Sequence, residues 1–307
     1  MIEVAEVASF GGPEALRIAE RPDPVPGTDE VVVRIHAANV NPTDLGARSG
    51  QVRARMPDLL PPFIPGWDLA GEVTSIGPGV HGLQPGDRVA GMIPWGRIGG
   101  RVGAYAEAAA VEARWLVKLP DRVGHAVAST LPLNALTARQ ALDLIGAAPG
   151  ATLLVTGASG AVGGFAVQLA VRDGLRVLAI ASDDDEEWVA GLGPAEVLPR
   201  STDLARLEPV DAVLDAVPIG PDSTAPLREG GVAVFTRPPD ASRLPPAIRA
   251  ETILVQPDQD ALRKVVEEHA AARLQTRIAE LLPLAQAGRA HARVEAGGLR
   301  GKLVLAP

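Results

Sequence analysis

The sequence predicts an α/β protein in which a β-rich region precedes a doubly wound parallel sheet. Two observations predict this fold. Residues 1–120 contain short β-branched runs, such as 31–35 and 71–76, separated by turns rich in Gly, Pro and Asp. From residue 151 onward, continuous apolar runs alternate with helical patterns, which is typical of strands buried on both faces of a parallel sheet.

The same patterns predict the individual elements. Helices are expected at 126–131 and 137–145. The second helix is expected to end there because Gly146 and Pro149 follow. Strands are expected at 151–155, 176–180, 212–214, 232–235 and 252–255, with a helix at 160–172 after the first strand. After residue 258 we expect two helices and a last strand at 302–305. The acidic run 183–187 is expected to be a solvated loop and helix start.

The composition of the 307-residue chain limits the classes of function. Hydrophobic residues make up 47% and charged residues 21%, which is ordinary for a globular protein. The net charge of -8 and the 3% of aromatic residues argue against a nucleic acid partner. No apolar run approaches the roughly 18 residues of a membrane span, and the acidic start lacks the positive charge of a secretory signal, so a cytoplasmic protein is expected. The absence of cysteine excludes disulfides, thiolate catalysis and cysteine-based metal sites.

A glycine-rich turn lies between the expected strand at 151–155 and the helix that follows. Its glycines, Gly157, Gly160 and Gly163, recur at three-residue spacing. Glycines at such a place permit a tight turn and let the backbone approach a pyrophosphate, while the helix N-terminus offers unpaired amide donors. The sequence therefore predicts a dinucleotide-binding site rather than an ordinary turn. The loop residues predicted to bind this cofactor are Gly157, Ser159, Gly160, Ala161, Val162 and Gly163.

The short-chain dehydrogenases have a related glycine pattern, which this sequence does not match. Their spacing would require glycine in place of Ala161. They also need a lysine at a fixed spacing after a catalytic tyrosine. Tyr105 is the only tyrosine of the chain, precedes the loop, and has Ala109 at that spacing. This family is therefore excluded.

Short segments spread along nearly the whole chain carry a resemblance to a known family. They are 10–14 (FGGPE), 40–44 (VNPTD), 65–73 (PGWDLAGEV), 77–80 (GPGV), 85–89 (PGDRV), 103–107 (GAYAE), 136–138 (LTA) and 301–305 (GKLVL). In this order they resemble the zinc-independent quinone oxidoreductases of the medium-chain dehydrogenase/reductase superfamily. The resemblance implies a GroES-like catalytic domain made of residues 1–120 and 258–307, with a Rossmann nucleotide-binding domain at 121–257 inserted between them. It also implies NAD(P)H as the cofactor and a homodimer.

The resemblance also identifies the positions that bind zinc in related alcohol dehydrogenases. There the residues matching Asn41 and Trp67 are a cysteine ligand and a histidine ligand, and neither replacement offers a thiolate or an imidazole. No metal site is therefore expected. Without a Lewis acid to polarise an alcohol oxygen, we expect hydride transfer to a small-molecule quinone or α,β-unsaturated carbonyl.

Several side chains are candidates for the catalytic site. The resemblance places Asn41 near the nicotinamide ribose and the substrate and Thr137 beside the nicotinamide ring, although a buried amide that satisfies loop backbone would also explain Asn41. Many relatives carry a tyrosine, a proposed proton donor, where this chain has Pro42. Tyr105 is then the candidate donor, with solvent as the alternative. Asp44 follows Asn41 at the spacing of a cap and is expected to cap the helix that begins there.

Two sets of residues point to different forms of the cofactor. Asp183 lies about twenty residues after Gly163, where an acid accepts the ribose hydroxyls of NAD. Ser182 and Arg200 match places from which relatives reach the 2′-phosphate of NADPH, and Lys302 resembles a cofactor contact of the family. On these grounds NADPH is favoured, and NADH is the alternative.

Two other functions stay open from the sequence. One is an enoyl reductase that acts on carrier-bound or natural-product intermediates, which a deep open cleft around 59–64 and Trp95 would favour. The other is a non-catalytic sensor protein that binds NADP(H), because the tyrosine expected at position 42 is missing.

Overall fold

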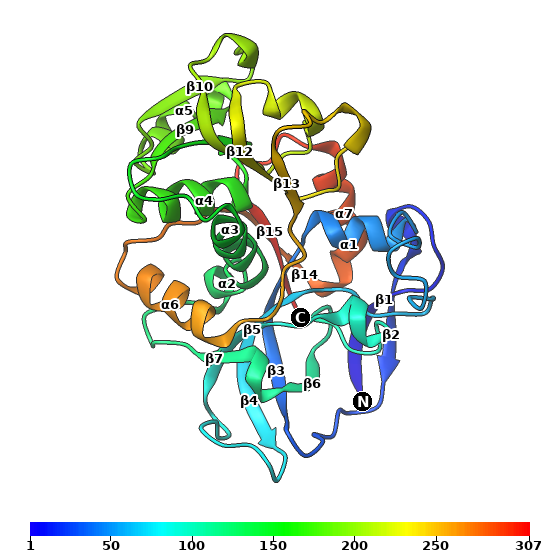
Figure 1. Ribbon diagram of the computed structural model, residues 1–307. Helices are drawn as coiled ribbons and strands as arrows, with labels where there is room; N and C mark the ends of the chain where they lie inside the picture. The colour runs from blue at the N-terminus through cyan, green and yellow to red at the C-terminus, as the bar shows by residue number, and fades with distance from the viewer. The chain divides into compact units, whose positions relative to one another are not determined.

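The computed structural model describes the whole chain, residues 1–307, which forms two compact units (Figure 1). Unit 1 consists of Met1–Leu133, Gln256–Arg273 and Arg277–Pro307, and unit 2 of Asn134–Val255 and Leu274–Thr276. Residues 121–133 belong to unit 1, where helix α2 (His125–Ala128) packs on three of its strands. No helix combines the length and the apolar character needed to cross a membrane.

Unit 2 is built around a six-stranded sheet with the strand order β10-β9-β8-β11-β12-β13. Its strands are β8 (Thr152–Thr156), β9 (Arg176–Ala181), β10 (Glu196–Pro199), β11 (Val210–Asp215), β12 (Leu227–Phe235) and β13 (Arg249–Thr252). Every pairing is parallel, and the chain order reverses between β8 and β11, which is where doubly wound sheets bind ligands. Helix α3 (Pro132–Ile145) precedes β8, α4 (Ala161–Arg172) joins β8 to β9, and α5 (Glu186–Ala190) joins β9 to β10.

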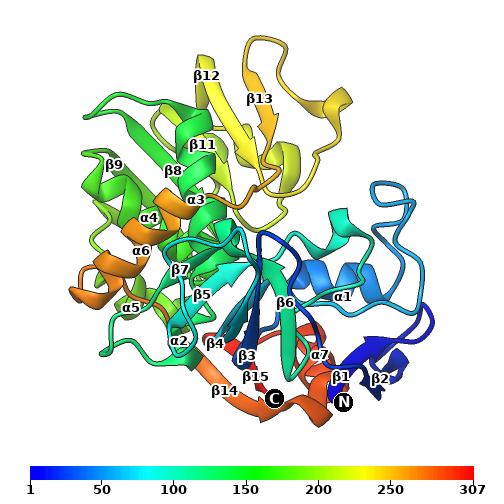
Figure 2. The same cartoon turned by 90° about the horizontal axis from the view of Figure 1, so that it is seen from below.

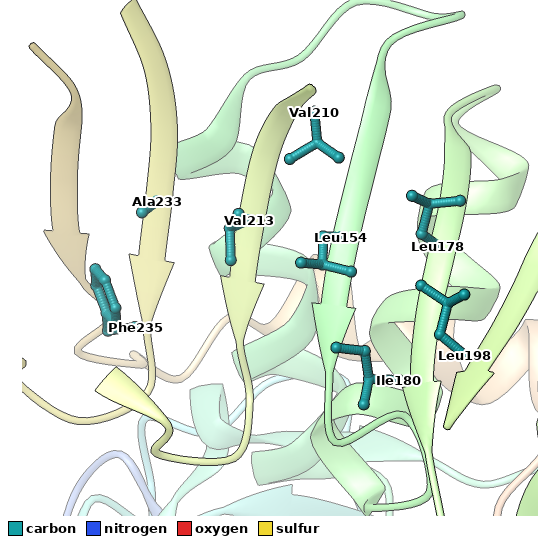
Figure 3. Packing of buried hydrophobic residues seen from close by; sticks show 8 residues of the cluster. All are labelled: Leu154, Leu178, Ile180, Leu198, Val210, Val213, Ala233 and Phe235. Carbon is teal, nitrogen blue, oxygen red and sulfur yellow. The ribbon is translucent and has the colours of Figure 1, made fainter. Parts of the chain in front are cut away.

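The core of this sheet explains why its strands read as apolar runs. Neighbouring strands contribute side chains to one buried cluster, seen in Figure 3, formed by Leu154, Leu178, Ile180, Leu198, Val210, Val213, Ala233 and Phe235. Full burial of a Leu, Val or Phe side chain stabilises a fold by about 1.5–3 kcal/mol. The cluster therefore holds β8, the strand that the glycine-rich turn follows, in the sheet.

Unit 1 contains a seven-stranded sheet that combines both ends of the chain. The strand order is β14-β15-β3-β4-β5-β7, and β6 pairs with β3 as well. Its strands are β3 (Glu30–Asn39), β4 (Asp68–Ile76), β5 (Arg88–Met92), β6 (Ala108–Glu112), β7 (Leu116–Lys118), β14 (Ile278–Pro283) and β15 (Lys302–Ala306). The C-terminal β15 pairs antiparallel with β3, and Figure 2 shows the red β15 beside the blue β3. The C-terminal segment thus completes the β-rich domain, as the resemblance implies.

Besides short 3-10 helices, the remaining elements of unit 1 are a hairpin and three further α-helices. The hairpin consists of β1 (Ile2–Val7) and β2 (Leu16–Arg21), and the helices are α1 (Pro42–Arg48), α6 (Gln259–Ala270) and α7 (Ala287–Ala296). Several elements differ from the expectation. The helix expected at 126–131 ends at Ala128, and the helix expected at 137–145 begins at Pro132, since proline suits the first turn of a helix. The strand expected at 252–255 lies at Arg249–Thr252, and the edge strands β10 and β14 were not expected.

Candidate active site

The glycine-rich turn joins the carboxyl end of β8 to the start of α4. Gly157 has a φ of +65°, a left-handed conformation that favours glycine. A Cβ atom at Gly163 would lie only 2.2 Å from the backbone oxygen of Gly157, so the turn and the helix can pack this closely only without a side chain there. The first amides of a helix have no partner four residues back, and α4 carries no acidic residue in its first turn. This helix end can therefore hold a phosphate group.

The predicted cofactor residues after β9 lie beside this turn. Ser159 Oγ accepts a hydrogen bond from the backbone N–H of Ser182 at 3.1 Å, and the two hydroxyl oxygens are 3.2 Å apart. Ser182 Oγ also donates to the buried carboxylate of Asp185 at 3.1 Å. Because the last residues of β9 and β10 are paired with each other, Ser182 and the exposed Arg200 follow at the same edge of the sheet.

A buried carboxylate at this sheet edge was missed by the sequence analysis. Asp215 ends β11, is 1% exposed, and accepts hydrogen bonds from Thr156 Oγ1 at 2.7 Å and from the backbone N–H of Gly220 at 2.8 Å. Burial raises the pKa of Asp215, and these hydrogen bonds oppose the rise. The carboxylate ties the end of β8 to the end of β11. An acid that directly follows an apolar run is the signal that could have identified it.

Unit 1 contains a buried polar cluster formed by β3, β4, the start of α1 and the first residue of β15. Asn41 precedes α1 and is 1% exposed. Its Oδ1 accepts hydrogen bonds from Lys302 Nζ at 2.9 Å and from Asn39 Nδ2 at 3.2 Å. Its Nδ2 donates to Asp68 Oδ2 at 2.7 Å. The structure thus brings together Asn41 and Lys302, two predicted site residues that are 261 positions apart.

Asp44 has the structural role that its spacing predicts. Its Oδ2 accepts the backbone N–H of Asn41 at 2.9 Å, which caps α1. Burial raises the pKa of Asp44 to about 7 and that of Asp68 to about 6, and the Lys302 ammonium lowers both. Burial lowers the pKa of Lys302 to about 8, against the attraction of the two carboxylates. The cluster therefore contains three groups that titrate near neutral pH.

Tyr105 lies deeper in unit 1 and is completely buried. Its hydroxyl oxygen is 3.0 Å from Nε2 of His291 on α7, and the hydroxyl also hydrogen-bonds the Asp44 carboxyl. Burial raises the pKa of Tyr105 well above its ordinary value and lowers the pKa of His291 to about 3. Both side chains are therefore neutral near pH 7. Direct proton donation by Tyr105 stays a prediction, and its burial favours a place behind Asp44 rather than at a substrate.

Trp95, named above beside a possible cleft, and Trp67 belong to an aromatic core. Trp67 is 5% exposed and Trp95 is 1% exposed, with ring centroids 6.0 Å apart. Phe63 stacks on Trp95 at 5.5 Å, and Leu59 is also buried. Phe63, Trp95 and Trp67 therefore pack on one another. Both indole N–H groups are buried without a hydrogen-bond partner.

The positions that bind zinc in related alcohol dehydrogenases do not fit a metal ion in this chain. The Asn41 amide oxygen already accepts hydrogen bonds from Lys302 and Asn39. Trp67 offers an indole that is a donor only. No three His, Cys, Asp or Glu side chains are grouped so that they could hold a metal ion. An ammonium group, rather than a set of metal ligands, faces the Asn41 amide.

The predicted site residues thus fall into two groups. In unit 2, Ser159 and Ser182 lie together at the glycine-rich turn, and Arg200 follows at the same sheet edge. Thr137 lies apart from them in sequence, on α3, and is 8% exposed. In unit 1, Asn41 and Lys302 are in contact, and Tyr105 belongs to the neighbouring buried network.

Two protein-family models match the chain. The alcohol dehydrogenase GroES-like domain matches residues 27–121, and the zinc-binding dehydrogenase model matches residues 192–305. These ranges cover most of unit 1 and the second half of unit 2.

Named relatives and a solved structure agree with these matches. The chain is 33% identical to a chloroplastic quinone oxidoreductase of Triphysaria versicolor, over 97% of this chain and 95% of the relative. A chloroplast envelope quinone oxidoreductase homolog of Arabidopsis thaliana is 37% identical over 66% of this chain, and the match spans 62% of that relative's length. An NADPH-dependent alkenal/one oxidoreductase of Arabidopsis thaliana is 30% identical over 84% of this chain and 67% of the relative.

The quinone oxidoreductase from Coxiella burnetii superposes with a TM-score of 0.90 and 28% identity, over 100% of this chain and 99% of that structure. Similarity of this extent covers both units. The chain therefore belongs to the quinone oxidoreductase family of the medium-chain dehydrogenase/reductase superfamily.

Proposed function

We propose that this chain is an NADPH-dependent reductase that transfers a hydride to a small-molecule quinone or α,β-unsaturated carbonyl. The observation that carries the proposal is the glycine-rich turn between β8 and α4, whose close packing and open helix N-terminus suit a pyrophosphate. Family membership supports the acceptor class, since relatives named for quinones and for alkenals or enones both match the chain. The bound nicotinamide supplies the hydride, and the chain binds and orients the partners.

Ser182 and Arg200 support NADPH over NADH. An exposed guanidinium beside a serine hydroxyl can bind a 2′-phosphate through charge-assisted hydrogen bonds. Asp185 is turned inward and accepts the Ser182 hydroxyl. Asp183 and Asp184 are the exposed acids that would favour NADH instead. The choice therefore depends on whether Arg200 outweighs these two carboxylates.

We further propose that the reaction needs no zinc. Asn41 and Trp67 offer neither thiolate nor imidazole, and the Asn41 amide is held by Lys302 and Asp68. Hydride addition to an electron-poor carbon requires hydrogen bonds to the acceptor oxygen rather than activation of an alcohol. Dialysis against a chelator should leave the activity unchanged.

The homodimer that the family resemblance implies is also part of this proposal. Light scattering of the purified protein measures its oligomeric state.

The test is a fluorescence titration with NADPH and NADH, followed by addition of benzoquinone, phenanthrenequinone or an alkenal. We expect tighter binding of NADPH and oxidation of the reduced cofactor, seen as loss of its near-ultraviolet absorbance. Arg200→Ala should weaken NADPH binding about tenfold and leave NADH binding nearly unchanged, because a hydrogen bond to a charged group contributes about 1.5–3 kcal/mol. Arg206→Ala, which removes another exposed arginine of unit 2, is the matched control.

Other outcomes distinguish the alternative functions. Tight binding of NADPH without oxidation by any acceptor would support the sensor protein. Turnover confined to carrier-linked enoyl substrates would support the enoyl reductase. A chain that binds neither nucleotide would contradict the proposal.

A further inference from the structure

The polar cluster of unit 1 contains one titratable group that reaches the surface. Asp44, Asp68, Tyr105 and His291 are all 0% exposed. Lys302 is partly exposed, although its ammonium hydrogen-bonds the buried Asn41 amide. Among these five groups, Lys302 is the only one whose side chain is partly exposed, so it offers the shortest route for a proton to a bound molecule.

We infer that Lys302 is the proton donor that completes the reduction. This inference rests on the proposed function and adds to it the identity of the acid. When a hydride and its two electrons reach the β-carbon of an enone, the acceptor becomes an enolate. One N–H bond of the Lys302 ammonium then breaks, and the proton forms a bond to the α-carbon or the oxygen. A quinone follows the same balance, because hydride gives a hydroquinone anion and the proton gives the hydroquinone. The neutral amine regains its proton from water.

The surroundings of Lys302 suit this role. Asp68 on β4 and Asp44 on α1 attract the ammonium, whereas β14 places the uncharged Ile278 opposite Lys302. Burial outweighs this attraction and lowers the pKa of Lys302 to about 8. A group with a pKa near the working pH both gives up and regains a proton readily, which an ordinary lysine does poorly.

The Asn41 amide orients the donor. Its nitrogen is fixed by the bond to Asp68 Oδ2, so its oxygen has to face Lys302 and Asn39. The ammonium donates one of its three N–H bonds to Asn41. The other two N–H bonds are not used by this contact. Asn41 is therefore a positioning residue for Lys302.

The first experiment separates proton donation from the cofactor contact that the resemblance implies for Lys302. Lys302→Met removes the acid and keeps an unbranched side chain, and Lys302→Arg keeps a positive charge that does not titrate in this range. We expect Lys302→Met to lower kcat at least about tenfold and to change the dissociation constant of NADPH less than twofold. Wild-type activity should fall as the pH rises through about 8, and this limb should be absent in both variants. Weaker NADPH binding at unchanged kcat, or a wild-type pH profile in Lys302→Met, would overturn the inference.

A second experiment needs no turnover. The chain has only three lysines, and Lys118 and Lys264 are exposed. Reductive methylation with ¹³C-formaldehyde therefore gives three lysine signals whose titration is followed by NMR, with Lys302→Arg assigning one of them. We expect the Lys302 signal to titrate at about pH 8, well below the ordinary lysine value. Titration of this signal at the ordinary lysine value, in a chain that reduces quinones, would overturn the inference alone. A wild-type chain that reduces no acceptor would overturn the proposed function and this inference with it.

Discussion

His291 is the residue whose burial has the clearest consequence for stability. It is 0% exposed, its Nε2 contacts the Tyr105 hydroxyl, and its Nδ1 is buried without a partner. A protonated ring would leave a buried charge beside Arg48, which also lowers the pKa of His291. The imidazole therefore stays neutral in the folded chain until the pH falls to about 3.

The burial of His291 predicts that the free energy of unfolding depends on pH. The unfolded chain takes up a proton at His291 below the ordinary pKa of 6.5, and the folded chain takes it up only near 3. The free energy of unfolding should therefore fall as the pH falls through this window, by at most about 1.4 kcal/mol per pH unit. The variant His291→Gln replaces the imidazole with a neutral amide, which can donate an N–H group but does not titrate. The pH dependence due to His291 should therefore be absent in this variant. Urea unfolding of both proteins between pH 7 and pH 5 measures the difference.

The difference in the free energy of unfolding between the wild-type chain and His291→Gln isolates the titration of His291. Asp44 and Asp68 have raised pKa values, so their contribution to stability is present at low pH and is lost as the pH rises. The wild-type chain and His291→Gln both contain these carboxylates, so their effect cancels in the difference. A constant difference between the two proteins from pH 7 to pH 5 would show that His291 is protonated in the folded chain.

At single positions, spacing predicted local roles and could not predict distant partners. The cap of α1 by Asp44 follows from its place after Asn41, because the geometry of a helix start is local. The contact of Asn41 with Lys302 joins residues near opposite ends of the chain, and only the resemblance implied that both belong to one site. The contact of His291 with Tyr105 could not be predicted either, since a lone histidine carries no signal of its partner.

At the scale of elements, the glycine-rich turn is the part that a single added methyl group can test. A Cβ at position 163 would lie 2.2 Å from the Gly157 oxygen, and backbone atoms cannot move aside as a flexible side chain can. Gly163→Ala should cost about 1–3 kcal/mol of stability and weaken NADPH binding, because the turn or the start of α4 has to shift. Urea unfolding and the fluorescence titration measure the two effects.

Gly124→Ala is the matched control for this substitution. Gly124 precedes α2 with a φ of -71°, and an added Cβ meets no atom within 4 Å. This variant should bind NADPH as the wild-type chain does. Equal effects of the two substitutions on NADPH binding would mean that the packing of the turn does not shape the nucleotide site.

The elements that the sequence predicted best are the buried strands of unit 2. Strands β8, β9, β11 and β12 appear as apolar runs because a parallel sheet is covered on both faces. The edge strand β14 was missed, since its side chains alternate between exposed and half-buried until Leu282. Nothing in such a short segment distinguishes a strand from a loop until its partner strand is known.

At the scale of the whole molecule, unit 1 depends on the meeting of the chain's two ends. β15 lies between β14 and β3, and its residues Leu303, Val304 and Leu305 are at most 1% exposed. A short apolar strand can pair with many edges, so local sequence could not predict this position. The resemblance implied it, because the family builds its first domain from both ends.

This arrangement predicts that loss of β15 unfolds unit 1. A chain that stops after Gly301 would leave β3 and β14 without their shared partner and would expose apolar side chains that β15 covers. Three of the four tryptophans, Trp67, Trp95 and Trp115, are buried in unit 1, and Trp188 lies in unit 2. The emission of the shortened chain should therefore shift strongly to longer wavelength. A chain that stops after Ala306 and lacks only the exposed Pro307 is the control and should keep the wild-type emission. Native emission in the chain that ends at Gly301 would show that unit 1 folds without its C-terminal strand, and any loss of activity would then be due to the missing Lys302 rather than to unfolding.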